Sequence, residues 1–319
     1  MATRALTHTG ALVRGLSSDF ALKALRRPAA AGAPAPAPID AALAARQHAA
    51  YVAALASCLP AGGVTALPAL EGAPDAVFVE DAAVVVGGRA LLARSGAAAR
   101  REEAASVGEA LRARGVACVA LAPPGTLDGG DVLWTGREFF CGLGARTNEV
   151  GLEALRAAFP GARVTGVPLG ALGAGARRAA RARLAHPTAR LISDGEGEEP
   201  PPLHLKSLLS VVGPDTLAVA DTPLGNAVAM HLQQHSGVPT GVRRAGGRLA
   251  FVLVPPAAAP AANALLVNGT LIVRAAEEHA EGAAELRRYA KDTGLKVLEV
   301  NMSEFAKADG ALTCCSILL

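Results

Sequence analysis

The sequence has few aromatic residues, no long apolar run and no dense basic block, and the last two absences exclude classes of protein. Aromatic residues make up only 3% of its 319 residues. No apolar run reaches the roughly 18 to 20 residues that a membrane-spanning helix needs, so we expect no membrane association. It has no dense block of Lys or Arg, and the net charge is only +3. Nucleic acid is therefore not an expected partner either.

Cysteines are few and are not arranged as a framework. Their number is odd, and no CxxC pair occurs, which argues against disulfides and against a structural zinc site. We expect most of them to be reduced, buried thiols of a cytoplasmic protein. They are Cys58, Cys118, Cys141, Cys314 and Cys315.

The first 30 residues carry five basic side chains against one acid, Asp19. This bias is typical of a mitochondrial transit peptide, but the alternative is a short strand at 11–14. A secretion signal is not favoured, because there is no apolar core segment of the usual length.

Strand and helix signals alternate along the chain with a period. Each unit reads as a β-hairpin, a helix and a further strand, and Asn268-Gly269 is a strong hairpin turn signal. Four complete units are predicted, over residues 76–121, 131–168, 205–254 and 264–301.

The two ends of the chain contain the pieces of a fifth unit. Residues 10–14, 39–58 and 64–68 lack one hairpin strand, and 312–318 is a strand without a partner. Joining them predicts a closed α/β ring of five strand–strand–helix–strand units. Each unit then packs against two neighbours, and no terminal unit has a face exposed to solvent. The alternative is an ordinary open α/β domain.

We expect the whole chain, residues 1–319, to form one domain with two loops. Residues 27–38 are rich in Ala and Pro, and 170–202 form a long polar stretch, interpreted as an extra flexible loop with a short helix near 176–185.

Cysteine and histidine are the residue types that could supply a nucleophile and a proton shuttle. Cys314 and Cys315 lie on the predicted closing strand, where neighbours point to opposite faces, so only one can face a given cavity. A thiolate needs a cationic neighbour, and the alternative is a pair of structural thiols. His204 is predicted to begin a strand beside the long loop, which suits a proton shuttle. Surface or capping roles suit the other six histidines better.

Two acidic clusters are the other candidates. Glu80 and Asp81 interrupt an apolar strand, so one carboxylate must meet a cation, either a bound guanidinium or a protein Arg. Asp128 and Asp131 flank a Gly-Gly pair, which permits close backbone approach at a strand entrance. The alternative for this second cluster is a plain turn.

Six segments, spread in order over most of the chain, together resemble a known family. They resemble dimethylarginine dimethylaminohydrolase of the animal type, and the acidic and cysteine positions resemble its first isoform type. The segments are 75–81 (DAVFVED), 126–133 (TLDGGDVL), 135–140 (TGREFF), 146–148 (RTN), 203–207 (LHLKS) and 312–316 (LTCCS).

The resemblance implies the pentein fold, a five-bladed α/β propeller with its site on the axis. It implies hydrolysis of asymmetric dimethylarginine and monomethylarginine to citrulline and a methylamine, which relieves inhibition of nitric oxide synthesis. No cofactor is implied. The expected partner is the small substrate, the expected state is a monomer, and zinc at Cys314 is expected to inhibit.

The resemblance also assigns site residues. It makes Cys314 the nucleophile, His204 the general acid and base, and Asp128 the carboxylate that orients His204. The residues it implies for substrate binding are Glu80 and Asp81 at the guanidinium, Asp75, Arg100 and Arg146 at the amino-acid end, and Leu25 and Ala308 through their backbones.

Two departures from the family concern loops, since 27–38 differs in composition and most of 170–202 is additional and adjoins His204. Alternatives to the implied activity are another guanidine-modifying pentein, such as an arginine deiminase or an amidinotransferase, and an inactive family member that only binds.

Overall fold

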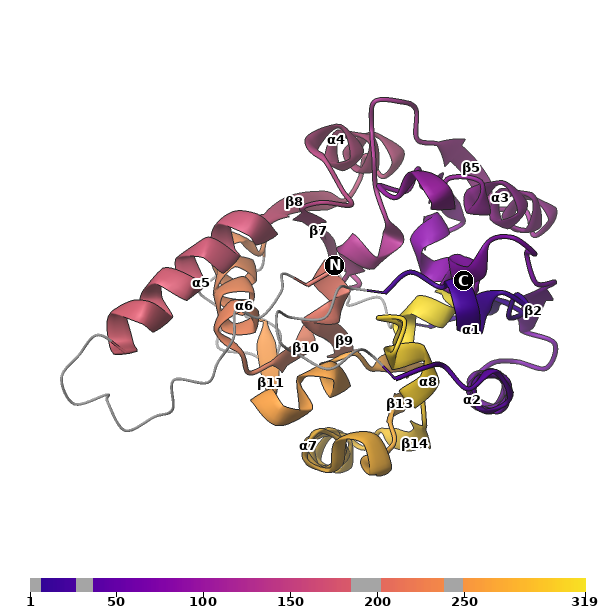
Figure 1. The fold of residues 1–319 in the computed structure, drawn as a ribbon. Coiled ribbons are helices and arrows are strands. Elements are labelled where there is room, and N and C mark those ends of the chain that lie inside the picture. Colours follow the sequence, from indigo (N-terminus) through magenta and orange to yellow (C-terminus); the bar gives the residue numbers. More distant parts are fainter. Residues whose placement is uncertain (1–6, 27–36, 185–201, 238–248) are drawn as a thin grey trace.

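Five three-stranded sheets are arranged in a ring in the computed structural model (Figure 1). The structure describes residues 7–26, 37–184, 202–237 and 249–319. In every sheet the inner strand pairs antiparallel with the middle strand, and the middle strand pairs parallel with the outer one. The predicted five-unit propeller is therefore confirmed.

Each sheet is one blade of the propeller. The strands, given from inner to outer, are β15 (Ile317–Leu318), β1 (Ala11–Arg14) and β2 (Val64–Leu67) in blade 1; β3 (Ala83–Val86), β4 (Arg89–Leu92) and β5 (Ala117–Ala120) in blade 2; β6 (Val132–Trp134), β7 (Glu138–Leu143) and β8 (Arg163–Pro168) in blade 3; β9 (Leu209–Gly213), β10 (Thr216–Ala220) and β11 (Ala250–Val254) in blade 4; and β12 (Leu265–Val267), β13 (Thr270–Arg274) and β14 (Lys296–Val300) in blade 5.

Blade 1 is completed by the two distant ends of the chain. Ala11 pairs with Leu318 and Leu12 with Ile317, and the Leu319 carbonyl accepts a hydrogen bond from the Thr9 N–H at 2.7 Å. The strand predicted to lack a partner thus supplies the missing strand of the incomplete unit.

One long helix connects the middle and outer strands of each blade. Polar caps start several of these helices: the Asp40 carboxylate accepts from the Leu43 N–H, and the Asn148 side chain accepts from the Gly151 N–H. The helices are α2 (Ala41–Ser57), α3 (Glu103–Ala113), α4 (Glu149–Ala158), α6 (Pro223–His235) and α7 (Ala276–Thr293), with short α1 (Phe20–Lys23) and α8 (Ser303–Ala306) in addition.

Two hairpin turns have the backbone conformation that their sequences predict. Asn268 and Gly269 have φ values of 46° and 80°, and Gly87 and Gly88 have 59° and 76°. Two successive positive φ values define the type I′ turn, which matches the twist of the strands it joins.

A short 3-10 helix precedes the inner strand of every blade, and this differs from the sequence prediction. Strands were expected to run through Glu80-Asp81, Cys314-Cys315 and the residues directly after His204, and these expectations were wrong. Four of these turns span only three or four residues, so their apolar pattern cannot be distinguished from that of a strand. The turns are η2 (Val79–Ala82), η4 (Gly129–Asp131), η5 (Leu205–Ser207), η6 (Pro256–Ala262) and η7 (Thr313–Cys315).

The additional segment is more regular than expected up to residue 184. Helix α5 (Leu169–Leu184) occupies residues 170–184 of what was predicted as a loop and is longer than the short helix expected near 176–185, and it packs against α6. Residues 185–201 of that loop, and residues 27–36 of the Ala/Pro-rich loop, lie outside the described residues.

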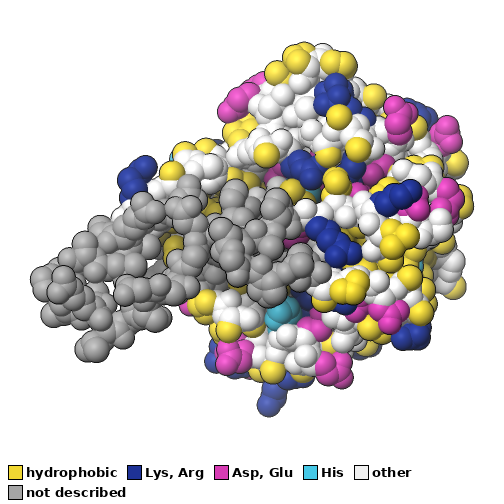
Figure 2. Space-filling view, in the orientation of Figure 1, with side chains coloured by type: hydrophobic (Ala, Val, Ile, Leu, Met, Phe, Trp, Pro, Cys, Tyr) yellow, Lys and Arg dark blue, Asp and Glu magenta, His cyan; other side chains and the backbone are white. Residues whose placement is uncertain are grey.

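The described residues include no helix with the length and apolar character needed to cross a bilayer. On the face in Figure 2, Lys and Arg side chains are interspersed with acidic and apolar ones, in keeping with the small net charge.

Candidate active site

The 3-10 turns meet at one end of the propeller axis and bring the candidate residues together. Turn η2 contacts η4 and η7, and η4 contacts η5. Glu80 and Asp81 lie in η2, Asp128 directly precedes η4, His204 directly precedes η5, and Cys314 lies in η7. Four blades therefore contribute side chains from equivalent places.

The His204 imidazole is buried between two carboxylates. Its Nε2 lies 3.0 Å from Oδ2 of Asp128 and 3.9 Å from Oδ1 of Asp81. The other Asp128 oxygen accepts from the Gly96 N–H at 3.1 Å. Asp128 is thus placed to fix the orientation and tautomer of the ring.

These carboxylates control the charge of the ring. Burial lowers the pKa of His204, but the negative charge of Asp81 and the hydrogen bond to Asp128 outweigh burial and raise it to about 9. The imidazole is therefore charged at neutral pH.

Asp81 is held by a protein arginine, the alternative that the sequence left open. The Arg100 Nη1 lies 2.6 Å from Asp81 Oδ2, and the Gly130 N–H donates to Oδ1 at 3.0 Å. Burial raises the pKa of Asp81, but the charges of His204 and Arg100 lower it to about 2.

Arg100 itself is fully engaged by the protein. Its guanidinium also bonds Glu103 and the main-chain carbonyls of Asp75 and Phe78, and the residue is 6% exposed. In this arrangement Arg100 holds η1 (Pro74–Val77) and Asp81 in place.

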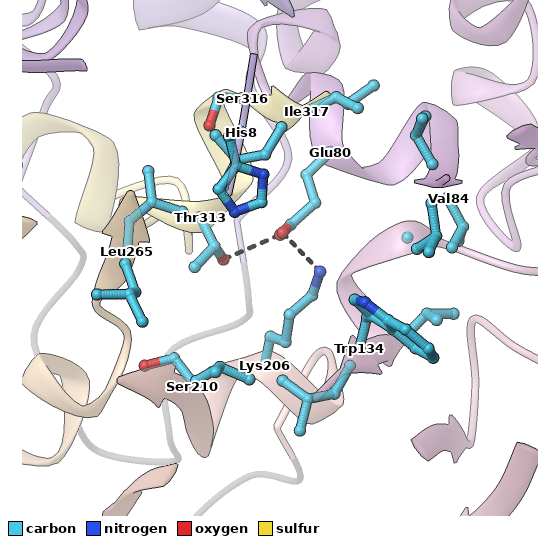
Figure 3. Close-up of a pocket in the computed structure, with 18 of the residues that line it drawn as sticks. His8, Glu80, Val84, Trp134, Lys206, Ser210, Leu265, Thr313, Ser316 and Ile317 are labelled. Atoms are coloured by element: carbon cyan, nitrogen blue, oxygen red, sulfur yellow. Dashed lines mark hydrogen bonds and ion pairs between the residues drawn. The ribbon is translucent and has the colours of Figure 1, made fainter. Parts of the chain in front are cut away.

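Glu80 lies on the axis between two blades. Its Oε1 accepts from the Lys206 ammonium at 2.6 Å, and its Oε2 accepts from the Thr313 hydroxyl at 3.0 Å (Figure 3). Burial raises the pKa of Glu80, while Lys206 lowers it.

Cys314 is half-buried beside this group, whereas Cys315 is fully buried. Burial and the negative charges of Glu80 and Asp81 raise the pKa of the Cys314 thiol to about 12, and Lys206 opposes this rise. Without a further cation the thiol is protonated at neutral pH.

The four remaining candidates lie around this centre. The Leu25 N–H donates to both oxygens of Asp75, at 3.0 and 3.2 Å, and Arg146 Nη1 lies 3.6 Å from Asp128 Oδ2. That Arg146 nitrogen is buried and has no hydrogen-bond partner among the described residues. Ala308 is buried in an apolar cluster against which Cys314 packs.

Several further residues support the site, and of these the sequence had singled out only Asp131, as a neighbour of Asp128. Asp131 accepts hydrogen bonds from the Leu205 N–H and the Thr147 hydroxyl, and the same hydroxyl accepts from the Asp128 N–H. Burial raises the pKa of Asp131 to about 6. Lys206, Thr147 and Asn263 were assigned no role from the sequence, because their partners are 16 to 126 residues away along the chain.

The paired glycines are required by close approach, as the sequence predicted. A Cβ on Gly129 would lie 2.0 Å from the Glu80 carbonyl oxygen, and one on Gly130 would lie 2.8 Å from His204 Cγ. Turns η2, η4 and η5 can pack this closely only without those side chains.

Asp81, Asp128 and His204 offer ligand atoms within 4.8 Å of one another. Each already has a protein partner, and the Arg100 guanidinium sits on Asp81, so we assign the three to a hydrogen-bonded network.

A cavity of about 170 Å³ extends along the axis on the far side of Glu80. It is lined by residues of all five inner strands, with Glu80, Lys206 and Thr313 at its end (Figure 3). Its lining includes Glu80 and Lys206 but neither Cys314 nor His204.

Comparison with solved structures confirms the five-bladed pentein fold. A structure of the Pseudomonas aeruginosa dimethylarginine dimethylaminohydrolase, a cysteine-to-serine mutant complexed with citrulline, matches with a TM-score of 0.74 and 23% identity over 98% of this chain and 100% of that chain. The N-terminal domain of ArgZ, a cyanobacterial arginine dihydrolase, matches with a TM-score of 0.68 and 18% identity over 97% of this chain and 96% of that chain. At such identities the likeness establishes the fold alone.

Sequence comparison goes further, although no family model matches the chain. The bovine putative hydrolase DDAH2 is 39% identical over 160 residues, 50% of this chain and 54% of that protein. Two relatives that match over wider spans are bacterial. The Pseudomonas aeruginosa dimethylarginine dimethylaminohydrolase is 28% identical over 279 residues, 87% of this chain and 89% of that protein. The Streptomyces coelicolor protein of that name is 35% identical over 251 residues, 78% of this chain and 76% of its own length, and the protein accordingly belongs to the dimethylarginine dimethylaminohydrolase family of hydrolases.

Proposed function

We propose that this protein hydrolyses asymmetric dimethylarginine and monomethylarginine to citrulline and the corresponding methylamine, with Cys314 as nucleophile. The observation that carries the proposal is the junction of η2, η4, η5 and η7, where a thiol and a charged imidazole lie beside buried carboxylates. Such a set suits covalent chemistry on a cation.

Substrate binding prepares the nucleophile. The free thiol is protonated, because burial and the charges of Glu80 and Asp81 raise its pKa to about 12. A guanidinium bound beside these carboxylates brings a positive charge next to the sulfur, which favours the thiolate and releases a proton to solvent. Arg146, whose Nη1 lacks a hydrogen-bond partner among the described residues, is the side chain we assign to the substrate carboxylate.

The reaction then proceeds in two halves. The thiolate attacks the guanidinium carbon, and the charged His204 gives its proton to the methylated nitrogen as the carbon–nitrogen bond breaks. Dimethylamine leaves, and a thiouronium remains on Cys314. The neutral ring next takes a proton from water as its oxygen adds to the carbon. The carbon–sulfur bond then breaks with its electron pair going to the sulfur, which takes up the remaining hydroxyl proton as citrulline is released.

Several finer points belong to the same proposal. They are the correspondence to the first animal isoform, the effect on nitric oxide synthesis, inhibition by zinc at Cys314, a monomeric state, and a cytoplasmic location.

The test is an assay of citrulline from dimethylarginine by the wild type and by Cys314→Ser. We expect citrulline and dimethylamine from the wild type and none from the variant, because an alcohol replaces the thiol. Matched incubations with arginine separate the alternatives. Ammonia from arginine, with no turnover of dimethylarginine, would identify a deiminase instead, and inert wild-type protein would identify a binding protein.

A further inference from the structure

One buried amide in blade 5 lies at the end of the 3-10 turn of that blade, whereas the candidate residues of the other blades lie in their turns or directly before them. Asn263 directly follows η6, at the entrance to inner strand β12, and is 2% exposed. Nothing in the sequence or in the resemblance gives it a role.

All the polar atoms of this side chain have partners on neighbouring turns. Its Nδ2 donates to Thr313 Oγ1 at 2.9 Å and to the Lys206 carbonyl at 3.0 Å, while its Oδ1 accepts from the Thr313 N–H at 3.0 Å. Thr313 belongs to η7 and Lys206 to η5. A single amide therefore connects the turn of the thiol to the turn that follows the imidazole.

These bonds also orient the groups around Glu80. Because the Thr313 oxygen accepts from Asn263, its own hydrogen is directed to Glu80 Oε2 (Figure 3). The residue after Thr313 is Cys314, so the same contacts fix the backbone that carries the sulfur.

We propose that Asn263 is a positioning residue that sets the placement of Cys314 relative to His204 and the orientation of the Thr313 hydroxyl toward Glu80. The proposal rests on the function proposed for Cys314 and His204. Truncation of the amide leaves the Thr313 N–H, the Thr313 oxygen and the Lys206 carbonyl without their partner, so η5 and η7 must shift. A misplacement of about 1 Å at a reacting group costs on the order of 100-fold in rate.

The first experiment compares Asn263→Ala with Asn301→Ala. Asn301 also joins neighbouring blades, since its Oδ1 accepts from Gln47 Nε2 at 2.6 Å, but it follows outer strand β14. We expect kcat for dimethylarginine to fall at least tenfold further in Asn263→Ala than in the control, with KM changed less than about threefold. Equal losses of kcat, or a change confined to KM, would overturn the proposal.

The second experiment asks whether Asn263 acts through Thr313. Thr313→Val removes the hydroxyl and Thr313→Ser keeps it, so serine should recover most of the rate that valine loses. The double variant Asn263→Ala/Thr313→Val should be at most about threefold slower than the slower single variant, because residues acting through one contact are not additive. A double variant whose loss of rate equals the product of the two single losses would overturn the proposal. If Asn263→Ala does not fold, the comparison of Thr313→Ser with Thr313→Val remains decisive.

A third measurement needs no turnover. Alkylation of Cys314 by iodoacetamide, mapped by mass spectrometry against pH, reports how the thiol is held. In Asn263→Ala the loosened turn should lower the pH at which alkylation of Cys314 is half-maximal, toward the pKa of about 8.5 of a free cysteine. Asn301→Ala should keep the wild-type midpoint. An unchanged midpoint in Asn263→Ala would overturn the inference, while wild-type protein that makes no citrulline would overturn only the proposed function.

Discussion

At the scale of single residues, the carboxylates around the Cys314 thiol outnumber the cationic side chains there. His204 is charged because two carboxylates surround it, and Asp81 stays ionised because His204 and Arg100 adjoin it. The thiol faces the surplus of negative charge and keeps its proton. Under the proposed function, a cationic substrate offsets this negative charge and activates the Cys314 nucleophile in the same step.

The His204–Asp128 contact leads to a prediction about turnover. Asp128→Asn should lower kcat for dimethylarginine by on the order of 100-fold or more, because the amide no longer fixes one tautomer or sustains the imidazolium. Citrulline release is the measurement, and Asp292→Asn on the exposed side of α7 is the control. Unchanged turnover in Asp128→Asn would refute the orienting role.

At the scale of elements, the 3-10 turns are what place these residues. Each turn lies at the entrance to an inner strand. Polar side chains of the turns, such as Glu80 and Asp81, therefore meet near the end of the axis, while Val79 and Cys315 pack into apolar clusters. Close packing of the turns follows from Gly129 and Gly130, where any Cβ would meet Glu80 or His204.

This packing leads to a prediction about stability. Gly129→Ala should destabilise the protein by about 1–3 kcal/mol or more, since its Cβ would lie 2.0 Å from the Glu80 carbonyl oxygen and that backbone must move. Thermal melting is the measurement. Gly170→Ala in α5 is the matched control, because a Cβ there meets nothing within 4 Å and alanine favours a helix. Equal melting temperatures for the two variants would contradict the role given to close approach.

Local signals explain how much of this arrangement could be predicted. The order of units and the turns at Gly87-Gly88 and Asn268-Gly269 can be predicted from residues adjacent in sequence, and the structure confirms both. The 3-10 turns were missed because an apolar run such as 76–86 does not reveal its backbone angles. The Asn263 and Lys206 contacts were missed because residues far apart in sequence make them.

At the scale of the whole molecule, the charge on His204 makes stability depend on pH. Its folded-state pKa of about 9 exceeds the ordinary value of 6.5, so its stabilising contribution is complete below pH 6.5 and is lost as the pH rises through 9. Burial raises the pKa of Asp131 from the ordinary 3.8 to about 6, so Asp131 costs stability as the pH rises from 3.8 to 6, and this loss is complete before the His204 contribution begins to change.

A comparison of variants isolates the histidine contribution. The difference in melting temperature between wild type and His204→Gln should narrow from pH 6.5 to pH 9, while exposed His235→Gln should follow the wild type throughout. A difference for His204→Gln that stays constant over this interval would show that the ring is not charged in the folded protein.

The pairing of β1 with β15 has a consequence during biosynthesis. When the ribosome makes the chain in order, β1 emerges early but its inner partner emerges about 300 residues later, so the backbone groups along one side of β1 stay open to other chains meanwhile. The segment that finally covers this edge also brings in Cys314. A nascent chain therefore possesses the carboxylates and the imidazole before the sulfur, and under the proposed function the onset of activity would report that the propeller has closed.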